Sequence, residues 1–201
     1  MGVVEYAALA RGETLPVTGA GVGGAAAQIG KWRGARVIGV DRYQLPSRSP
    51  AARAIDDFIL LEDEPRDSAV HRLTKGRGAQ VVFDAVGGPR FEPALRSLAH
   101  RGRQVEITSA IDRRVSFDLH DFYHNESRLL GVDTRKRDAT ASPAVLEALT
   151  PFFEGGAFQA PVIDRVIPLS EGCSAYATIA SNTGYTIGSL TRPAAANGMA
   201  G

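Results

Sequence analysis

The sequence contains little that would suit an oxidising compartment or a membrane. A single cysteine, Cys173, in 201 residues excludes an intrachain disulfide and a cysteine-rich zinc site. No apolar run approaches the ~20 residues that a transmembrane helix needs, and the N-terminus lacks the basic and apolar regions of a secretory signal. We therefore expect a cytoplasmic location and no membrane partner.

An excess of charge of one sign is also missing. The 23 Lys and Arg residues nearly balance the 22 Asp and Glu residues, so the formal net charge is +1 and no strong field is available to steer nucleic acid. Hydrophobic residues make up 44% of the chain and charged residues 22%, which is ordinary for a folded globular protein. The composition predicts a folded protein whose partner is a small molecule, with no nucleic-acid partner.

Short β-branched runs alternate with segments of helical periodicity over residues 14–133. Strands are expected at 14–19, 36–40, 58–61, 79–86, 103–110 and 127–133, and helices at 22–34, 51–55, 66–76, 89–102 and 116–126. Parallel strands need a helix-sized crossover, so this alternation is typical of a doubly wound sheet. The sequence predicts an α/β fold with a Rossmann-type doubly wound parallel sheet of about six strands.

The remainder of the chain has a different pattern. An amphipathic helix is expected at 142–156, where a double glycine ends it, and a β-α-β segment follows with strands at 161–169 and 185–190 around a helix at 170–182. Three parts are therefore expected, which are a Rossmann NAD(P)-binding domain at 1–155, a C-terminal segment at 156–192 and a flexible tail at 193–201.

A glycine-rich stretch, "VTGAGVGGAAAQ", stands between the first expected strand and the first expected helix. Gly19, Gly21 and Gly24 satisfy the pattern G-x-G-x-x-G in the strand-to-helix context that gives the pattern meaning. The first glycine permits the tight turn, the second lets the backbone approach a pyrophosphate, and the third lets the helix pack close to the strand. Free N–H groups at the start of the helix then face the anion. The stretch predicts a dinucleotide turn.

An acidic residue ends the second expected strand. Asp41 follows Gly19 by 22 residues, and a carboxylate there accepts both ribose hydroxyls and disfavours a 2′-phosphate. This favours NAD, although Arg42 would suit NADP, so both cofactors stay open. A solvated Asp41 beside a plain glycine-rich loop is one alternative. S-adenosylmethionine binding is another, but that class usually has an acidic residue where this chain has Val17 and Thr18.

With these elements placed, the chain resembles the medium-chain dehydrogenase/reductase superfamily, in the branch of zinc-type alcohol dehydrogenases and quinone oxidoreductases. The segments that carry the resemblance are residues 12–41, 78–107, 122–133 and 161–190, in which "DAVGG" followed by "ALRSLAHRGR" is the most distinctive. The resemblance implies an NAD(P)(H)-dependent oxidoreductase that transfers hydride to or from a carbonyl or quinone.

The resemblance also implies where the cofactor binds. The implied contacts with the dinucleotide are Gly19, Gly21, Val22, Gly23, Gly24, Asp41, Arg42, Ala85, Val86, Gly87, Thr108 and Ser109. The glycines lie along the pyrophosphate, Asp41 lies at the ribose, and the last five residues lie along the path of the adenosine and nicotinamide. The sixth strand, around 129–132, is the edge by which such domains often pair, which implies a homodimer.

Departures from the family pattern are as informative as the matches to it. Family members begin with a GroES-like catalytic domain that supplies the zinc ligands or the substrate pocket, whereas this chain begins just before its cofactor domain. We therefore expect a truncated chain with no zinc site, in which 156–192 is the remnant of the catalytic domain, and the sequence identifies no catalytic residue. The competing hypothesis is a catalytically incomplete nucleotide-binding module. Pro16 is a further departure, because it removes a hydrogen-bond donor from a central strand.

Other reactive residues fit surface or structural roles better. His120 and His124 are spaced as in zinc hydrolases, but Asp121 stands where those enzymes have a longer glutamate, so a surface or dimer-facing pair is expected. Cys173 is expected to be a packed structural thiol, and Asp84 is expected to organise the loop that follows it. No tyrosine has a lysine four residues later, which excludes the usual short-chain dehydrogenase chemistry.

Overall fold

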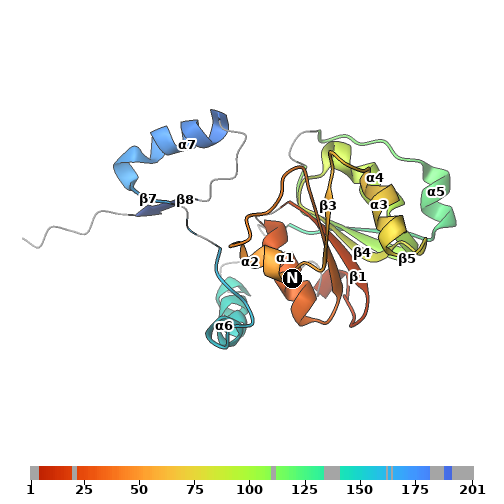
Figure 1. Cartoon of the computed structure of the whole chain (residues 1–201), viewed down its shortest axis with the longest axis horizontal. Coiled ribbons are helices and arrows are strands. Elements are labelled where there is room, and N and C mark those ends of the chain that lie inside the picture. Colours follow the sequence, from red (N-terminus) through yellow and green to blue (C-terminus); the bar gives the residue numbers. More distant parts are fainter. Residues whose placement is uncertain are drawn as a thin grey trace, which may run out of the picture. The chain divides into compact units, whose positions relative to one another are not determined.

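The structure is a computed structural model in which residues 5–19, 22–109, 112–133, 141–161, 163, 165–181 and 188–191 are described. The chain divides into two compact units, Met1–Ala160 and Pro161–Gly201, which are treated separately. The first unit contains a six-stranded parallel sheet in the order β3-β2-β1-β4-β5-β6 (Figure 1). The predicted α/β fold with six strands is confirmed.

The elements of the first unit follow the predicted alternation. The strands are β1 (Thr14–Thr18), β2 (Arg36–Asp41), β3 (Asp57–Leu60), β4 (Ala79–Asp84), β5 (Leu98–Glu106) and β6 (Arg128–Gly131). The helices are α1 (Val22–Trp32), α2 (Pro50–Ala54), α3 (Arg66–Leu73), α4 (Phe91–Arg96), α5 (Leu119–His124) and α6 (Ala141–Glu154), with a 3₁₀ turn, η2 (Gly88–Arg90), before α4. Among the described residues, no helix is both long and apolar enough to cross a membrane.

Both faces of the sheet are covered, which explains why its strands are nearly continuous apolar runs. On one face, side chains of the strands pack with α1 in a core that includes Leu15, Val37, Val81 and Val105. On the other face they pack with α3 and α4, whose Val70 and Leu95 join Val40 and Val82. Helices α3 and α4 lie side by side on that face (Figure 1).

Glycines let α1 approach β1 closely. A Cβ built at Gly23 would lie 2.8 Å from the carbonyl oxygen of Thr18, and one built at Gly30 would lie 2.6 Å from Cδ2 of Leu15. Real Cβ atoms do not approach other atoms this closely, so the helix could not hold its place with larger residues at these positions. The helix therefore starts directly above the carboxyl end of β1.

Pro16 lies within the central strand, as its sequence position predicts, and it shapes the sheet there. The N–H of Thr14 donates to the side-chain oxygen of Gln80 on β4 at 2.9 Å, so alternate residues of β1 direct their N–H groups towards β4. Pro16, two residues later, has no N–H to give on that side. The β1–β4 ladder accordingly begins only at Val17, whereas β1 pairs with β2 along its full length.

The helix predicted at 89–102 is shorter than expected. Helix α4 ends at Arg96, and β5 already begins at Leu98, which pairs with Ala79 before the register shifts. Arg101 adopts φ of 62°, and its N–H donates to the carbonyl oxygen of Asn125 at 2.8 Å. Residues 98–102, which were predicted as the end of the helix, instead form an irregular start to β5. Pairing with distant parts of the chain outweighs their helical propensity.

The second unit contains a two-stranded parallel sheet. Strand β7 (Arg165–Pro168) pairs with β8 (Gly188–Thr191), and a 3₁₀ turn, η4 (Leu169–Glu171), and helix α7 (Gly172–Ser181) lie between them in the chain. The arrangement is the predicted β-α-β segment. Cys173 is exposed on α7, so the expectation of a packed thiol was wrong. The predicted tail, 193–201, lies outside the described residues.

Candidate functional site

The carboxyl ends of β1, β2, β4 and β5 meet at one edge of the sheet, and they bring together most of the residues expected to bind a cofactor. Gly19 follows β1 with φ of +82°, and a Cβ built on it would lie 3.6 Å from side-chain atoms of both Ala85 and Val86. The glycine turn and the segment after β4 are therefore in direct contact. Gly21 lies outside the described residues, and Val22 begins α1.

Asp41 ends β2 at this edge with its side chain 9% exposed. Its Oδ1 accepts a hydrogen bond from the N–H of Arg42 at 2.7 Å, whereas Oδ2 is buried without a partner. Buried acceptors are nearly always hydrogen-bonded, so Oδ2 is available to a donor such as a ribose hydroxyl. The guanidinium of Arg42 lies over the ring of Tyr43, 5.7 Å from its centroid.

The buried hydroxyl of Thr18 was not singled out from the sequence. Its Oγ1 also has no hydrogen-bond partner, and the residue is the last of β1, directly before Gly19. The signal in the sequence is a hydroxyl residue at the end of an apolar strand that precedes a glycine turn. Together with Asp41, Thr18 gives the edge two unpartnered buried oxygens on adjacent strands.

Little space exists beside these groups. The cavity lined by the glycine turn and Asp41 measures about 10 Å³, and its far wall is formed by Leu45, Ala51, Ile55 and Phe58. That volume holds about one water molecule. The two unpartnered oxygens of Thr18 and Asp41 therefore have room for little more than one hydroxyl-sized donor beside them.

The turn after β4 is fixed at the centre of the edge. Asp84 is fully buried, and its Oδ1 accepts hydrogen bonds from the N–H groups of Val86 at 2.9 Å and Gly87 at 3.2 Å. Gly87 has φ of +66°, and a Cβ built there would lie 2.5 Å from the carbonyl oxygen of Thr108. Asp84 therefore organises the loop, as predicted, and the loop bridges the glycine turn and the segment after β5.

A buried polar cluster lies beneath this turn, and sequence reasoning missed it. It consists of Arg66 at the start of α3, Asp84, and Gln104 and Glu106 on β5. Burial raises the pKa of Glu106 to about 7, and the charge of Asp84 acts in the same direction, while Gln104 and Arg66 oppose it. The available signal was the pair of polar residues on either side of the buried Val105, near the carboxyl end of the strand.

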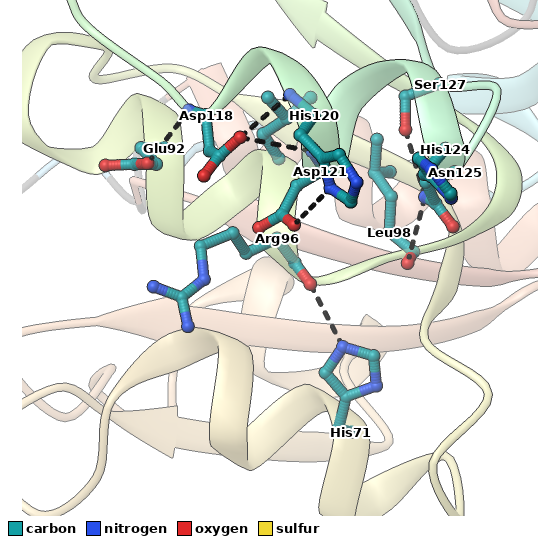
Figure 2. Close-up of a pocket in the computed structure, with 11 residues that line it drawn as sticks. His71, Glu92, Arg96, Leu98, Asp118, His120, Asp121, His124, Asn125 and Ser127 are labelled. Atoms are coloured by element: carbon teal, nitrogen blue, oxygen red, sulfur yellow. Dashed lines mark hydrogen bonds and ion pairs between the residues drawn. The ribbon is translucent and has the colours of Figure 1, made fainter.

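A separate cavity of about 460 Å³ lies between α3, α4 and α5 (Figure 2). Leu98, which begins β5, lines it, so it lies at the amino edge of the sheet, away from the glycine turn. Oδ1 of Asp118 accepts hydrogen bonds from the N–H groups of His120 and Asp121 and thereby caps α5. The rings of His120 and His124 stack with centroids 4.1 Å apart.

The groups on α5 have the composition of a weak metal site. Ligand atoms of Asp118, His120 and Asp121 lie within 4.8 Å of one another, and all three residues are exposed. Two of the three are carboxylates, and one of these already caps the helix. The placement agrees with the expected surface histidine pair, and nothing in the geometry links it to the carboxyl edge.

Comparisons with known proteins identify the family of the chain. Residues 21–150 match the family described as "Zinc-binding dehydrogenase". An acryloyl-coenzyme A reductase of Metallosphaera sedula is 36% identical over 118 residues, which are 58% of this chain and 33% of that protein. The resemblance to the medium-chain dehydrogenase/reductase superfamily is confirmed.

Solved structures show the same fold. The crystal structure of AibC has a TM-score of 0.82 and 26% identity, covering 96% of this chain and 52% of that one. An NAD-dependent alcohol dehydrogenase has a TM-score of 0.78 and 26% identity, covering 90% of this chain and 51% of that one. The chain thus spans about half the length of these structures and a third of the length of the curated reductase.

Proposed function

The chain belongs to the zinc-binding dehydrogenase family, and from that premise we propose that it is an NAD(P)(H)-dependent oxidoreductase chain. It binds a dinucleotide along the carboxyl edge of the sheet and presents the nicotinamide for hydride transfer to or from a carbonyl or quinone. The name of the acryloyl-coenzyme A reductase adds an unsaturated thioester as a candidate acceptor. The observation that carries the proposal is the unpartnered buried Oδ2 of Asp41, next to the glycine turn on the adjacent strand.

Each part of the edge has a role in this proposal. The N–H groups at the start of α1, with Gly23 and Gly24, face the pyrophosphate, and Asp41 accepts the ribose hydroxyls. The segments at 85–87 and 108–109 line the nicotinamide half. The nicotinamide supplies the hydride chemistry when bound, while the protein orients it. The described residues at this edge do not offer the His and Cys ligands of a catalytic zinc site, so no step is assigned to zinc.

Asp41 makes NAD the preferred cofactor of the proposal. Its carboxylate repels the 2′-phosphate of NADP, while Arg42 stands beside it as the group that would favour that phosphate. Calorimetric titration of the purified chain with NADH and with NADPH should give the lower Kd for NADH. Replacing Asp41 with Ser should shift the ratio of the two Kd values towards NADPH by roughly tenfold, or about 1.4 kcal/mol.

A matched control is available on α5. Asp121→Ser removes an exposed carboxylate far from the glycine turn and should leave both Kd values unchanged. If neither nucleotide binds the parent chain at millimolar concentration, the cofactor proposal is lost. If NADH binds but the ratio is the same in Asp41→Ser as in Asp121→Ser, the assignment of the ribose to Asp41 is wrong.

The second candidate function is that of a catalytically incomplete nucleotide-binding module. It is favoured by the absence of a recognisable acid, base or metal site among the described residues at the cofactor edge. Hydride transfer to quinones, aldehydes and enoyl thioesters distinguishes the two, because a module binds NADH without oxidising it. The methyltransferase alternative has lost its support, since the family is one of oxidoreductases.

The remaining proposals concern assembly. Strand β6 is the edge of the sheet, and its Leu129 is 37% exposed, which supports pairing of two chains through residues 129–132. Sedimentation should then detect a homodimer, and Leu129→Lys should yield monomers. The division of the chain after Ala160 supports the proposal of a separate C-terminal part from a catalytic domain, but it places residues 156–160 with the nucleotide-binding domain, where the N–H of Gln159 donates to Gln28.

A further inference from the structure

Arg66 is a buried cation with no hydrogen-bond partner. It is the first residue of α3, its side chain is 2% exposed, and Nε, Nη1 and Nη2 all lack an acceptor. Fully buried arginines are rare unless an opposite charge compensates the loss of hydration. Its presence here requires negative charge close by.

Two carboxylates supply that charge. Asp84 and Glu106 end neighbouring strands and are Cα partners in the β4–β5 register, so their side chains emerge next to each other on the face that α3 covers. Burial lowers the pKa of Arg66, while the charges of Asp84 and Glu106 act to raise it and that of Arg90 in η2 acts to lower it. Unpartnered acceptors lie in the same cluster, namely Oδ2 of Asp84 and Oε1 of Gln104.

The two carboxylate oxygens of Asp84 differ in their hydrogen bonds. Oδ1 accepts the N–H groups of Val86 and Gly87, and such bonds are roughly twice as strong when the acceptor is ionised. Oδ2 remains unpartnered within the buried cluster that contains Arg66. A buried carboxylate is costly unless an opposite charge lies near it. Arg66 supplies positive charge in the cluster that contains the acceptor of the turn.

We propose that Arg66 is a positioning residue for the dinucleotide, because its buried positive charge shares one cluster with the carboxylates of Asp84 and Glu106, and Asp84 fixes the 85–87 turn between Gly19 and Thr108. Arg66 touches neither the turn nor the cofactor path by a hydrogen bond and acts through Asp84. This inference rests on the proposed function for its link to the cofactor. The link from Arg66 to the turn does not depend on that function, because it rests on the burial of Arg66, the register of Asp84 and Glu106, and the hydrogen bonds of Asp84.

The test compares four variants of the whole chain, each assayed well below its melting temperature. Arg66→Gln removes the charge, Arg66→Lys retains it, and Asp84→Asn breaks the second link. Arg72→Gln is the control, because Arg72 lies on the same helix, is 60% exposed and pairs with Glu64. The readouts are the amide proton shifts of Val86 and Gly87 without cofactor, and the Kd for NADH.

Arg66→Gln and Asp84→Asn should move both amide shifts upfield and weaken NADH binding by about tenfold. Arg66→Lys should restore most of both signals, and Arg72→Gln should change neither. The proposal is overturned if Arg66→Gln matches Arg72→Gln in both readouts, or if Arg66→Lys behaves like Arg66→Gln. Should Arg66→Gln fail to fold, unaltered amide shifts and unaltered NADH binding in Asp84→Asn would also overturn it.

Failure of the proposed function gives a different pattern. A parent chain that binds neither dinucleotide refutes the function and, with it, the cofactor link of Arg66. The amide shifts of Val86 and Gly87 still decide, without any cofactor, whether the charge of Arg66 fixes the turn.

Discussion

Substituting Gly87 with alanine tests how tightly the turn after β4 is held. Two costs are expected. An alanine at φ of +66° pays the left-handed penalty, which is about 1–2 kcal/mol. In addition, its Cβ would lie 2.5 Å from the carbonyl oxygen of Thr108 and 3.2 Å from Cα of Ser109, and overpacking of this kind costs about 1–3 kcal/mol. The free energy of unfolding should therefore fall by about 2–5 kcal/mol.

Gly76 provides a control that separates the two costs. It has φ of +80°, and a Cβ built there would meet nothing within 4 Å, so Gly76→Ala carries the backbone penalty without the clash. Urea denaturation of both variants should show Gly87→Ala to be less stable than Gly76→Ala by about 1–3 kcal/mol. Only Gly87→Ala should also weaken NADH binding. Equal losses of stability would refute the close contact between the turn and Thr108.

Two further predictions concern partly buried carboxylates and pH. Burial acts to raise the pKa of Glu13, but hydrogen bonds from Arg103 and Ala10 lower it overall, so its stabilisation is present above the unfolded pKa and is lost as pH falls. Glu13→Gln should cost about 1–3 kcal/mol at pH 7, and urea titrations should show this gap narrowing in acid; a constant gap would contradict the pair with Arg103. The pKa of Glu106 shifts in the opposite direction, because it is raised to about 7. The folded state therefore loses stability as the pH rises from the unfolded pKa to 7. Glu106→Gln should therefore gain stability relative to the parent at pH 8 by on the order of 1 kcal/mol more than at pH 5, and equal differences at both pH values would show that Glu106 titrates normally.

Local patterns were enough to predict the sheet. Most of the strands from β1 to β6 contain short apolar runs that alternate with helical segments, and parallel crossovers leave few ways to arrange such runs. The position of Asp41 at the end of β2 could be predicted for the same reason, because its distance from the glycine turn is set by one helix and one strand. The end of α4 was missed, since the conformation of Arg101 depends on Asn125 in another part of the chain.

The buried cluster could not be predicted for a related reason. Arg66 looks like the first charged residue of a surface helix, where arginine is common, and only the fold places it against Asp84 and Glu106. Its burial depends on three elements that are separate in the sequence, namely α3, β4 and β5. Pro16 could be predicted in part. The sequence shows that the strand lacks an N–H donor at Pro16, but only the structure shows that the missing donor is on the side of β4.

The small volume beside Asp41 gives the proposed binding a mechanistic consequence. A cavity of about 10 Å³ holds about one water molecule, so in the proposed binding a ribose reaches the buried Oδ2 of Asp41 only where Leu45 and its neighbours give way. Residues 42–49 contain neither helix nor strand, and displacing them breaks no sheet pairing, whereas moving Phe58 would disturb β3. The loop at 42–49 is therefore the part that moves. The free energy needed to move it lowers the affinity that Asp41 and the glycine turn provide. Tight binding of NADH would have to overcome that cost, so the loop after Asp41, as well as Asp41 itself, sets the affinity.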